Sequence, residues 1–91
     1  MQNIPPEESL IEYPSDFPIK VMGKAHPDFA RTLTELVREF DPGFDPATVE
    51  MRPSRSGKYI GLTFIVRATS REQLDNLYRA LHGHHMVSIV L

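Results

Sequence analysis

The first regular pattern in the sequence is an alternation of apolar and polar positions that starts near residue 17. One face of this segment carries Phe17, Ile19 and Val21, and the other carries Lys20 and Met22. A period of two residues is typical of a strand with one face against a core. We expect this strand to end at Gly23.

A helical pattern follows the strand. Pro27 suits the first turn of a helix because its φ is already helical and its missing N–H would be unpaired there. Asp28 adds negative charge at the positive end of the helix dipole. The apolar stripe of this helix consists of Phe29, Leu33, Leu36, Val37 and Phe40. Residues 41–43, which read DPG, should end it.

Two further alternating segments predict a hairpin. Residues 47–53 place Val49 and Met51 on one face, and Pro53 confines this strand to a short length or an edge. Residues 54–58 have the composition of a turn. In residues 59–68 one face carries Ile60, Leu62, Phe64 and Val66, and the other carries Tyr59, Gly61, Thr63, Ile65 and Arg67.

A second helix and a closing strand complete the pattern. Residues 69–73 contain two overlapping capping boxes, Thr69 with Glu72 and Ser70 with Gln73. The stripe of the helix is Leu74, Leu77, Tyr78 and Leu81, and Gly83 is its expected C-cap. In the last strand, residues 86–91, we expect one face to carry Val87, Ile89 and Leu91, and the other Ser88 and Val90.

This β-α-β-β-α-β order predicts a ferredoxin-like α+β sandwich, in which a four-stranded antiparallel sheet carries both helices on one face. A length of 91 residues suits one small core rather than two. We therefore expect a single domain over residues 13–91. Residues 1–12, which include the run PPEE, should form a flexible lead-in.

Composition narrows the range of functions. A net charge of −2 and a pI near 6.0 argue against nucleic acid or anionic lipid as a partner. Because the chain has no cysteine, disulfides and thiolate metal sites are excluded. The first residues show no basic stretch followed by an apolar one, and no run of about 18 apolar residues occurs, so we expect neither a signal peptide nor a membrane span. We expect a cytoplasmic protein without a cofactor or a metal.

Several short segments, in order, resemble the YbeD-like family of small uncharacterised bacterial proteins. They are EYPSDFPIKVMG, SGKY, ATSREQLDNLYRAL and VSIVL, and the resemblance covers roughly residues 10–91. It implies a ferredoxin-like fold similar to ACT domains, regulatory modules that bind amino acids or other small effectors. The run HGHH at residues 82–85 departs from the family pattern.

The similarity to ACT domains implies a candidate ligand site at the first strand-to-helix junction, formed by Gly23, Lys24, Ala25 and His26. Glycine permits close backbone approach, and N–H groups at a helix start favour an anion such as a carboxylate. The alternative is that Gly23 only supplies an unusual φ and that Pro27 only starts a helix.

A second candidate site is the sheet face opposite the helices, for which we expect Met22, Tyr59, Ile65 and Val90 among polar neighbours. Such a mixed surface suits self-association or a protein partner. We expect a homodimer, since a domain of this size gains stability by associating. Scattered apolar surface residues without function are the alternative.

Three other functions find less support. His82, His84 and His85 straddle a predicted helix end and have no local carboxylate, which argues against a metal site. The third strand lacks the alternating aromatics of an RNA-recognition motif. An acylphosphatase would need an arginine early in the first helix and an asparagine in the third strand, and both are missing. We therefore expect a non-catalytic binding or regulatory module.

Overall fold

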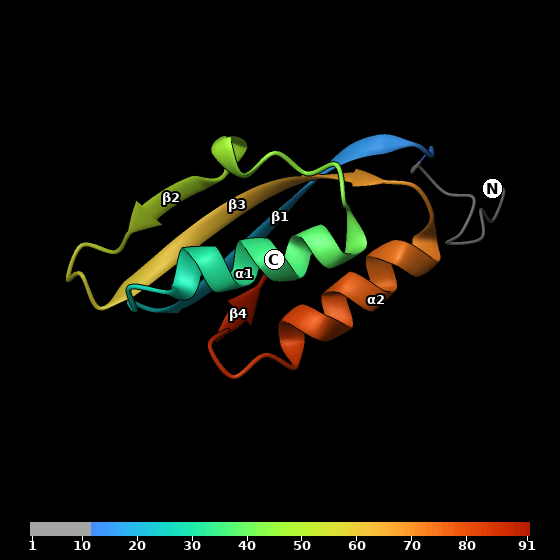
Figure 1. Cartoon of the computed structure of the whole chain (residues 1–91). Helices are drawn as coiled ribbons and strands as arrows, with labels where there is room; N and C mark the ends of the chain where they lie inside the picture. The colour runs from blue at the N-terminus through green and yellow to red at the C-terminus, as the bar shows by residue number, and fades with distance from the viewer. Residues whose placement is uncertain (1–11) are drawn as a thin grey trace, which may run out of the picture.

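The computed structural model describes residues 12–91, so the expected flexible lead-in lies almost wholly outside the described residues. The elements are, in order, β1 (Ser15–Lys24), α1 (Phe29–Phe40), the 3-10 turn η2 (Pro46–Thr48), β2 (Glu50–Pro53), β3 (Tyr59–Ala68), α2 (Arg71–His82) and β4 (Ile89–Val90). The strands form one antiparallel sheet in the order β2-β3-β1-β4, and both helices cover the same face (Figure 1). The predicted ferredoxin-like α+β fold is confirmed.

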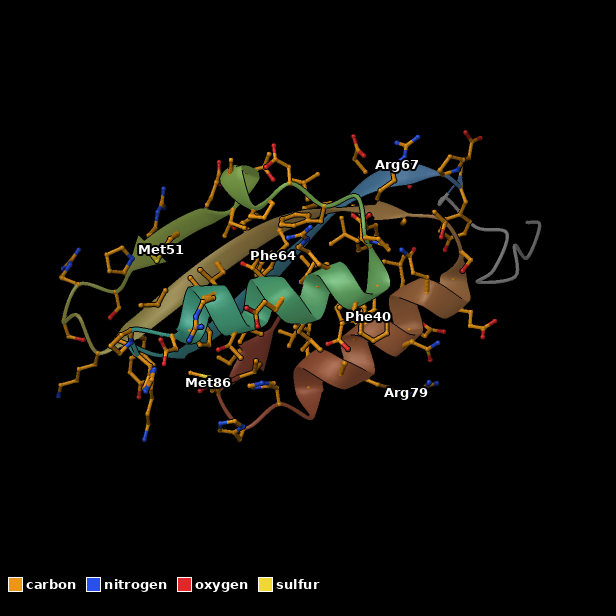
Figure 2. All side chains as sticks on the ribbon, viewed as in Figure 1. Phe40, Met51, Phe64, Arg67, Arg79 and Met86 are labelled. Atoms are coloured by element: carbon orange, nitrogen blue, oxygen red, sulfur yellow. The ribbon has the colours of Figure 1, made fainter. Side chains whose placement is uncertain are left out.

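The core fills the space between the sheet and the two helices. The inward faces of β1 and β3 and the apolar stripes of both helices meet there, as the alternation and the helical spacing predicted. Its largest fully buried members are Ile19, Val21, Phe29, Leu33, Val37, Leu62, Phe64, Val66, Leu77 and Leu81. Figure 2 shows Phe64 lying between the sheet and α1.

The first strand is longer than predicted, and Gly23 does not end it. β1 pairs with β3 along ten residues, from Ser15 opposite Ala68 to Lys24 opposite Tyr59. A Cβ on Gly23 would collide with the Met86 carbonyl oxygen and would lie 2.6 Å from Cε1 of Phe29. Gly23 is therefore required because other atoms occupy the space of a side chain, not because the chain turns there.

Two other boundaries differ from expectation. α1 begins at Phe29, and Pro27 precedes it in a turn. The strand expected over residues 47–53 begins only at Glu50. Asp45 explains this, because its Oδ1 accepts the Ala47 N–H at 2.9 Å and its carbonyl accepts the Thr48 hydroxyl at 2.7 Å. These local hydrogen bonds favour a turn over an extended chain.

The second helix uses the capping box of Ser70 and Gln73. Ser70 Oγ accepts the Gln73 N–H at 3.0 Å, and Gln73 Oε1 accepts the Thr69 N–H at 2.7 Å. The amide nitrogen of Gln73 also donates to the carbonyls of Phe40 (2.8 Å) and Arg67 (3.1 Å). One side chain thus joins the ends of α1 and β3 to the start of α2. Gly83 is the C-cap, as predicted.

The phase expected for the last strand is wrong. β4 sets Val90 opposite Val21 and Ile89 opposite Met22, so Val90 packs against the core while Ile89 lies on the outer face. Alternation fails because residues 85–87 turn, with the Val87 N–H donating to the His84 carbonyl at 3.0 Å. Val87 and Val90 both reach the core from this bent segment.

We predict that Gly23→Ala lowers the free energy of unfolding by about 1–3 kcal/mol, the usual cost of overpacking a filled site. Gly61→Ala is the matched control in the neighbouring strand, because its Cβ would meet nothing closer than the Arg52 carbonyl oxygen at 3.7 Å. Urea denaturation of both variants measures the difference. Equal stabilities would contradict the packing role of Gly23.

A second prediction concerns Asp41, which is 7% exposed and whose Oδ2 accepts the Arg67 N–H at 3.0 Å. Asp41→Ala should cost about 1–3 kcal/mol of stability because this N–H loses its partner. Asp41→Asn keeps an acceptor oxygen and should lose less. Thermal and urea unfolding of the two variants would contradict this interpretation if alanine were tolerated as well as asparagine.

Candidate functional site

The sheet face turned away from the helices, here called the open face, carries the outward side chains of all four strands. Its members are Asp16, Pro18, Lys20, Met22 and Lys24 of β1, Glu50 and Arg52 of β2, Tyr59, Gly61, Thr63, Ile65 and Arg67 of β3, and Ile89 and Leu91 at β4. Figure 2 shows Arg67 on the side of the sheet away from α1 and α2.

A hollow of about 680 Å³ lies on the open face over Gly61, and we call it the Gly61 hollow. The register sets Arg52 on one side of Gly61 and Met22 on the other, with Ile89 beyond Met22. Because Gly61 has no side chain, it leaves a gap between the side chains of the two neighbouring strands. Tyr59 and Thr63 border this gap along β3.

Five large apolar side chains are exposed on the open face, and all of them except Ile65 line the hollow. Their exposed fractions are 42% for Met22, 40% for Tyr59, 44% for Ile65, 51% for Ile89 and 73% for Leu91. Met22, Tyr59 and Ile65 thus lie on the face expected from the sequence. Val90 does not, and Ile89 and Leu91 take its place.

Positive charge surrounds these apolar groups. Arg67 Nη1 pairs with Asp16 Oδ1 at 3.2 Å near the end of the sheet. Of the ion pairs formed by residues 12–91, none includes Lys20, Lys24 or Arg52. The open face is therefore both apolar and basic, a combination that suits a partner with apolar and acidic groups.

At the first strand-to-helix junction, backbone N–H groups find their hydrogen-bond acceptors within the protein. The Ala25 N–H donates to the Lys58 carbonyl at 2.8 Å, and Gly23 packs on Phe29 and Met86. His26 Nδ1 accepts the Asp28 N–H at 3.0 Å, so this ring caps the start of α1. Lys24, an even-numbered residue of β1, lies on the open face. The four residues thus have different surroundings, and their role in ligand binding stays a prediction.

The histidines near the end of α2 form stacked pairs. The ring centroids of His84 and His85 lie 4.7 Å apart, and the ring centroids of His82 and Tyr78 lie 6.4 Å apart. Burial raises the pKa of the Tyr78 hydroxyl above its usual value. His84 Nδ1 accepts the Met86 N–H at 3.1 Å and so shapes the turn into β4.

Within residues 12–91, no three histidine, cysteine, aspartate or glutamate side chains gather in an arrangement that could hold a metal ion. Neither α1 nor α2 is long and apolar enough to cross a lipid bilayer, and the same range contains no other helix that is.

Sequence reasoning missed Ile89, Leu91 and the role of Gly61. The signal for Gly61 was present, since it is the one position without a side chain on the outward face of residues 59–67. No comparable signal existed for Ile89 and Leu91, because their side of the sheet depends on the turn that precedes β4.

Comparisons with known proteins identify relatives along the whole chain. A family described as "Protein of unknown function (DUF493)" matches residues 8–91. A UPF0250 protein of Bordetella pertussis is 84% identical over 91 residues and covers all of both chains. One from Ralstonia nicotianae is 69% identical over 87 residues, 96% of this chain and 90% of its own.

A solved structure shares the fold. The solution structure of protein HP0495 from H. pylori covers 100% of this chain and 98% of its own, with a TM-score of 0.74 and 15% sequence identity. At this identity the likeness supports the fold and carries no information on function.

The junction yields a third prediction. His26→Ala should lower stability by about 0.5–1 kcal/mol, because the Asp28 N–H loses its acceptor at the helix start. Lys24→Ala is the control, since none of the ion pairs formed by residues 12–91 includes Lys24. Urea denaturation measures both, and a larger loss for Lys24→Ala would contradict the capping role of His26.

Proposed function

Because the chain belongs to the DUF493 family, whose function is unknown, we propose a function from the open face: it is a non-catalytic binding module that holds a protein partner there. The family assignment agrees with the resemblance to YbeD-like proteins. The observation that carries the proposal is the Gly61 hollow, where exposed apolar side chains lie beside Lys20 and Arg52, which form no ion pair within residues 12–91.

The position of the hollow, rather than its size, favours a protein surface as its occupant. Its volume falls within the range of about 300–1,000 Å³ seen for ligand sites. It lies on a sheet surface, however, and its border of exposed methionine, isoleucine, leucine and tyrosine continues beyond it. Contiguous apolar surface rimmed by polar groups is typical of protein interfaces.

The two edges of the sheet are poorly suited to pair with an added strand, which favours binding through the open face. The backbone groups of Lys20 and Met22 point toward β4 and form hydrogen bonds with that segment. Pro18 is in the same phase, so its nitrogen points toward this edge of β1 at a position where β4 no longer pairs with the strand. Directly after β2, the backbone N–H of Ser54 donates to the Tyr59 carbonyl at 2.8 Å, so by alternation the nitrogen of Pro53 points away from β3. Proline has no N–H to offer an added strand, so it disfavours pairing at both edges.

Effector sensing at residues 23–26 is a second candidate. Its support is Lys24, an exposed cation whose register partner is Tyr59, so a small carboxylate could meet both. A thermal-shift screen of amino acids and small carboxylates tests it. Stabilisation that Lys24→Ala abolishes would support the site, whereas no stabilisation by any compound would rule it out. Gly23 variants are unsuitable here because they disturb the core.

We predict that Gly61→Leu fills the hollow and reduces partner binding while the domain stays folded. Quantitative affinity capture should compare the natural chain with Gly61→Leu and with Gly43→Leu, the same change in the loop after α1, where a Cβ would meet only Asp41 Oδ1, at 3.9 Å. Proteins bound through the face should be depleted about tenfold by Gly61→Leu, which corresponds to 1.4 kcal/mol.

The outcome is decided by the comparison of the two variants. Depletion by Gly61→Leu with retention by Gly43→Leu supports the proposal. Capture that both variants leave unchanged, with circular dichroism showing that both are folded, would refute binding at the open face.

A further inference from the structure

We infer that the open face binds an acidic segment of its partner, one that presents an apolar side chain between two carboxylates. The inference rests on the proposed function and adds the chemistry of the partner. Three observations carry it: the charge of the open face, the order of side chains along β1, and the size of the Gly61 hollow.

The first observation is that positive charge gathers on this face against the sign of the whole chain. The protein has a net charge of −2. On the open face, Asp16 and Arg67 compensate one another at 3.2 Å. Among the side chains of residues 12–91 on this face, the cations Lys20, Lys24 and Arg52 then face one further carboxylate, that of Glu50. Such a local excess of one sign attracts and orients a partner of the other sign.

The second observation is the order of side chains along β1. Lys20, Met22 and Lys24 follow one another on the open face at alternate positions. Two extended chains have the same rise of about 3.3 Å per residue. An extended segment lying over β1 with the pattern acidic-x-apolar-x-acidic would therefore place a carboxylate near each lysine and its apolar side chain near Met22.

The third observation is the space available at the centre of this arrangement. The apolar side chain of such a segment would lie beside Met22 and Ile89 and project over Gly61. The hollow of about 680 Å³ can accept a side chain of leucine or phenylalanine size. Arg52, on the far side of Gly61, offers a further partner for a carboxylate.

Two other occupants fit this surface less well. A second copy packed face to face by a two-fold axis would bring the same cations together, which opposes association. Single-stranded RNA is usually held by stacking on several aromatic side chains, and the open face offers Tyr59 alone among residues 12–91. Both occupants are included as outcomes of the test.

The test is an NMR titration of the ¹⁵N-labelled protein with three short synthetic peptides. In the first, glutamate, glycine, leucine, glycine and glutamate follow one another; the others carry glutamine or lysine in place of glutamate. We expect the acidic peptide to shift the amides of Met22, Gly61 and Thr63. The glutamine peptide should bind more weakly, and the lysine peptide should not bind. Added salt should weaken binding of the acidic peptide.

Charge reversal gives the matched comparison. Lys20→Glu should weaken binding of the acidic peptide by about fivefold, the upper effect of a solvent-exposed ion pair. Arg38→Glu makes the same reversal on the exposed side of α1 and should leave binding unchanged. Equal binding of the acidic and lysine peptides would overturn the inference.

The remaining outcomes separate this inference from the proposed function. Saturable binding of a uridine oligonucleotide at the same amides without peptide binding would overturn it in favour of RNA. A dimer in light scattering that Gly61→Leu dissociates would overturn it in favour of a second copy. If Gly61→Leu abolishes affinity capture and Lys20→Glu does not, the inference that the partner segment is acidic is overturned, and the proposed function stands. Capture insensitive to both variants would refute the proposed function as well.

Discussion

The pairing of β1 with β3 is the interaction on which the rest of the structure depends. These two central strands match along ten residues, so every side chain between Ser15 and Lys24 is assigned to the core or to the open face. The core side provides the surface on which α1 and α2 pack. The opposite side sets the order of Lys20, Met22 and Lys24 on the open face, where Lys20 and Met22 line the Gly61 hollow. One register thus determines both stability and the candidate site.

Gly23 links this central pairing to the end of the chain. The Met86 carbonyl and the Phe29 ring occupy the space where a side chain would otherwise lie. The chain then continues to the Ser88 N–H, which donates to the Met22 carbonyl at 2.8 Å. The pairing that follows sets Val90 opposite Val21 and Ile89 opposite Met22, so Val90 meets the core and Ile89 lies on the open face.

The fold alone does not specify what the protein does. A ferredoxin-like chain from H. pylori shares the architecture at 15% identity, and architectures of this kind carry unrelated functions. The side chains on the open face are therefore the informative part of the molecule. These side chains differ from the chain as a whole, because cations that form no ion pair within the described residues border exposed apolar groups in a protein of net negative charge.

Sequence alone determined the elements whose pattern is local. The alternation over residues 59–68 predicted β3 and both of its faces, and the spacing of Leu74, Leu77 and Leu81 predicted α2, because side-chain direction in a strand or helix follows from the backbone period. Only the tertiary structure decided the phase of β4, the packing role of Gly23 and which side chains of the neighbouring strands surround Gly61. Each of these depends on contacts between segments far apart in the chain, and no local period encodes such contacts.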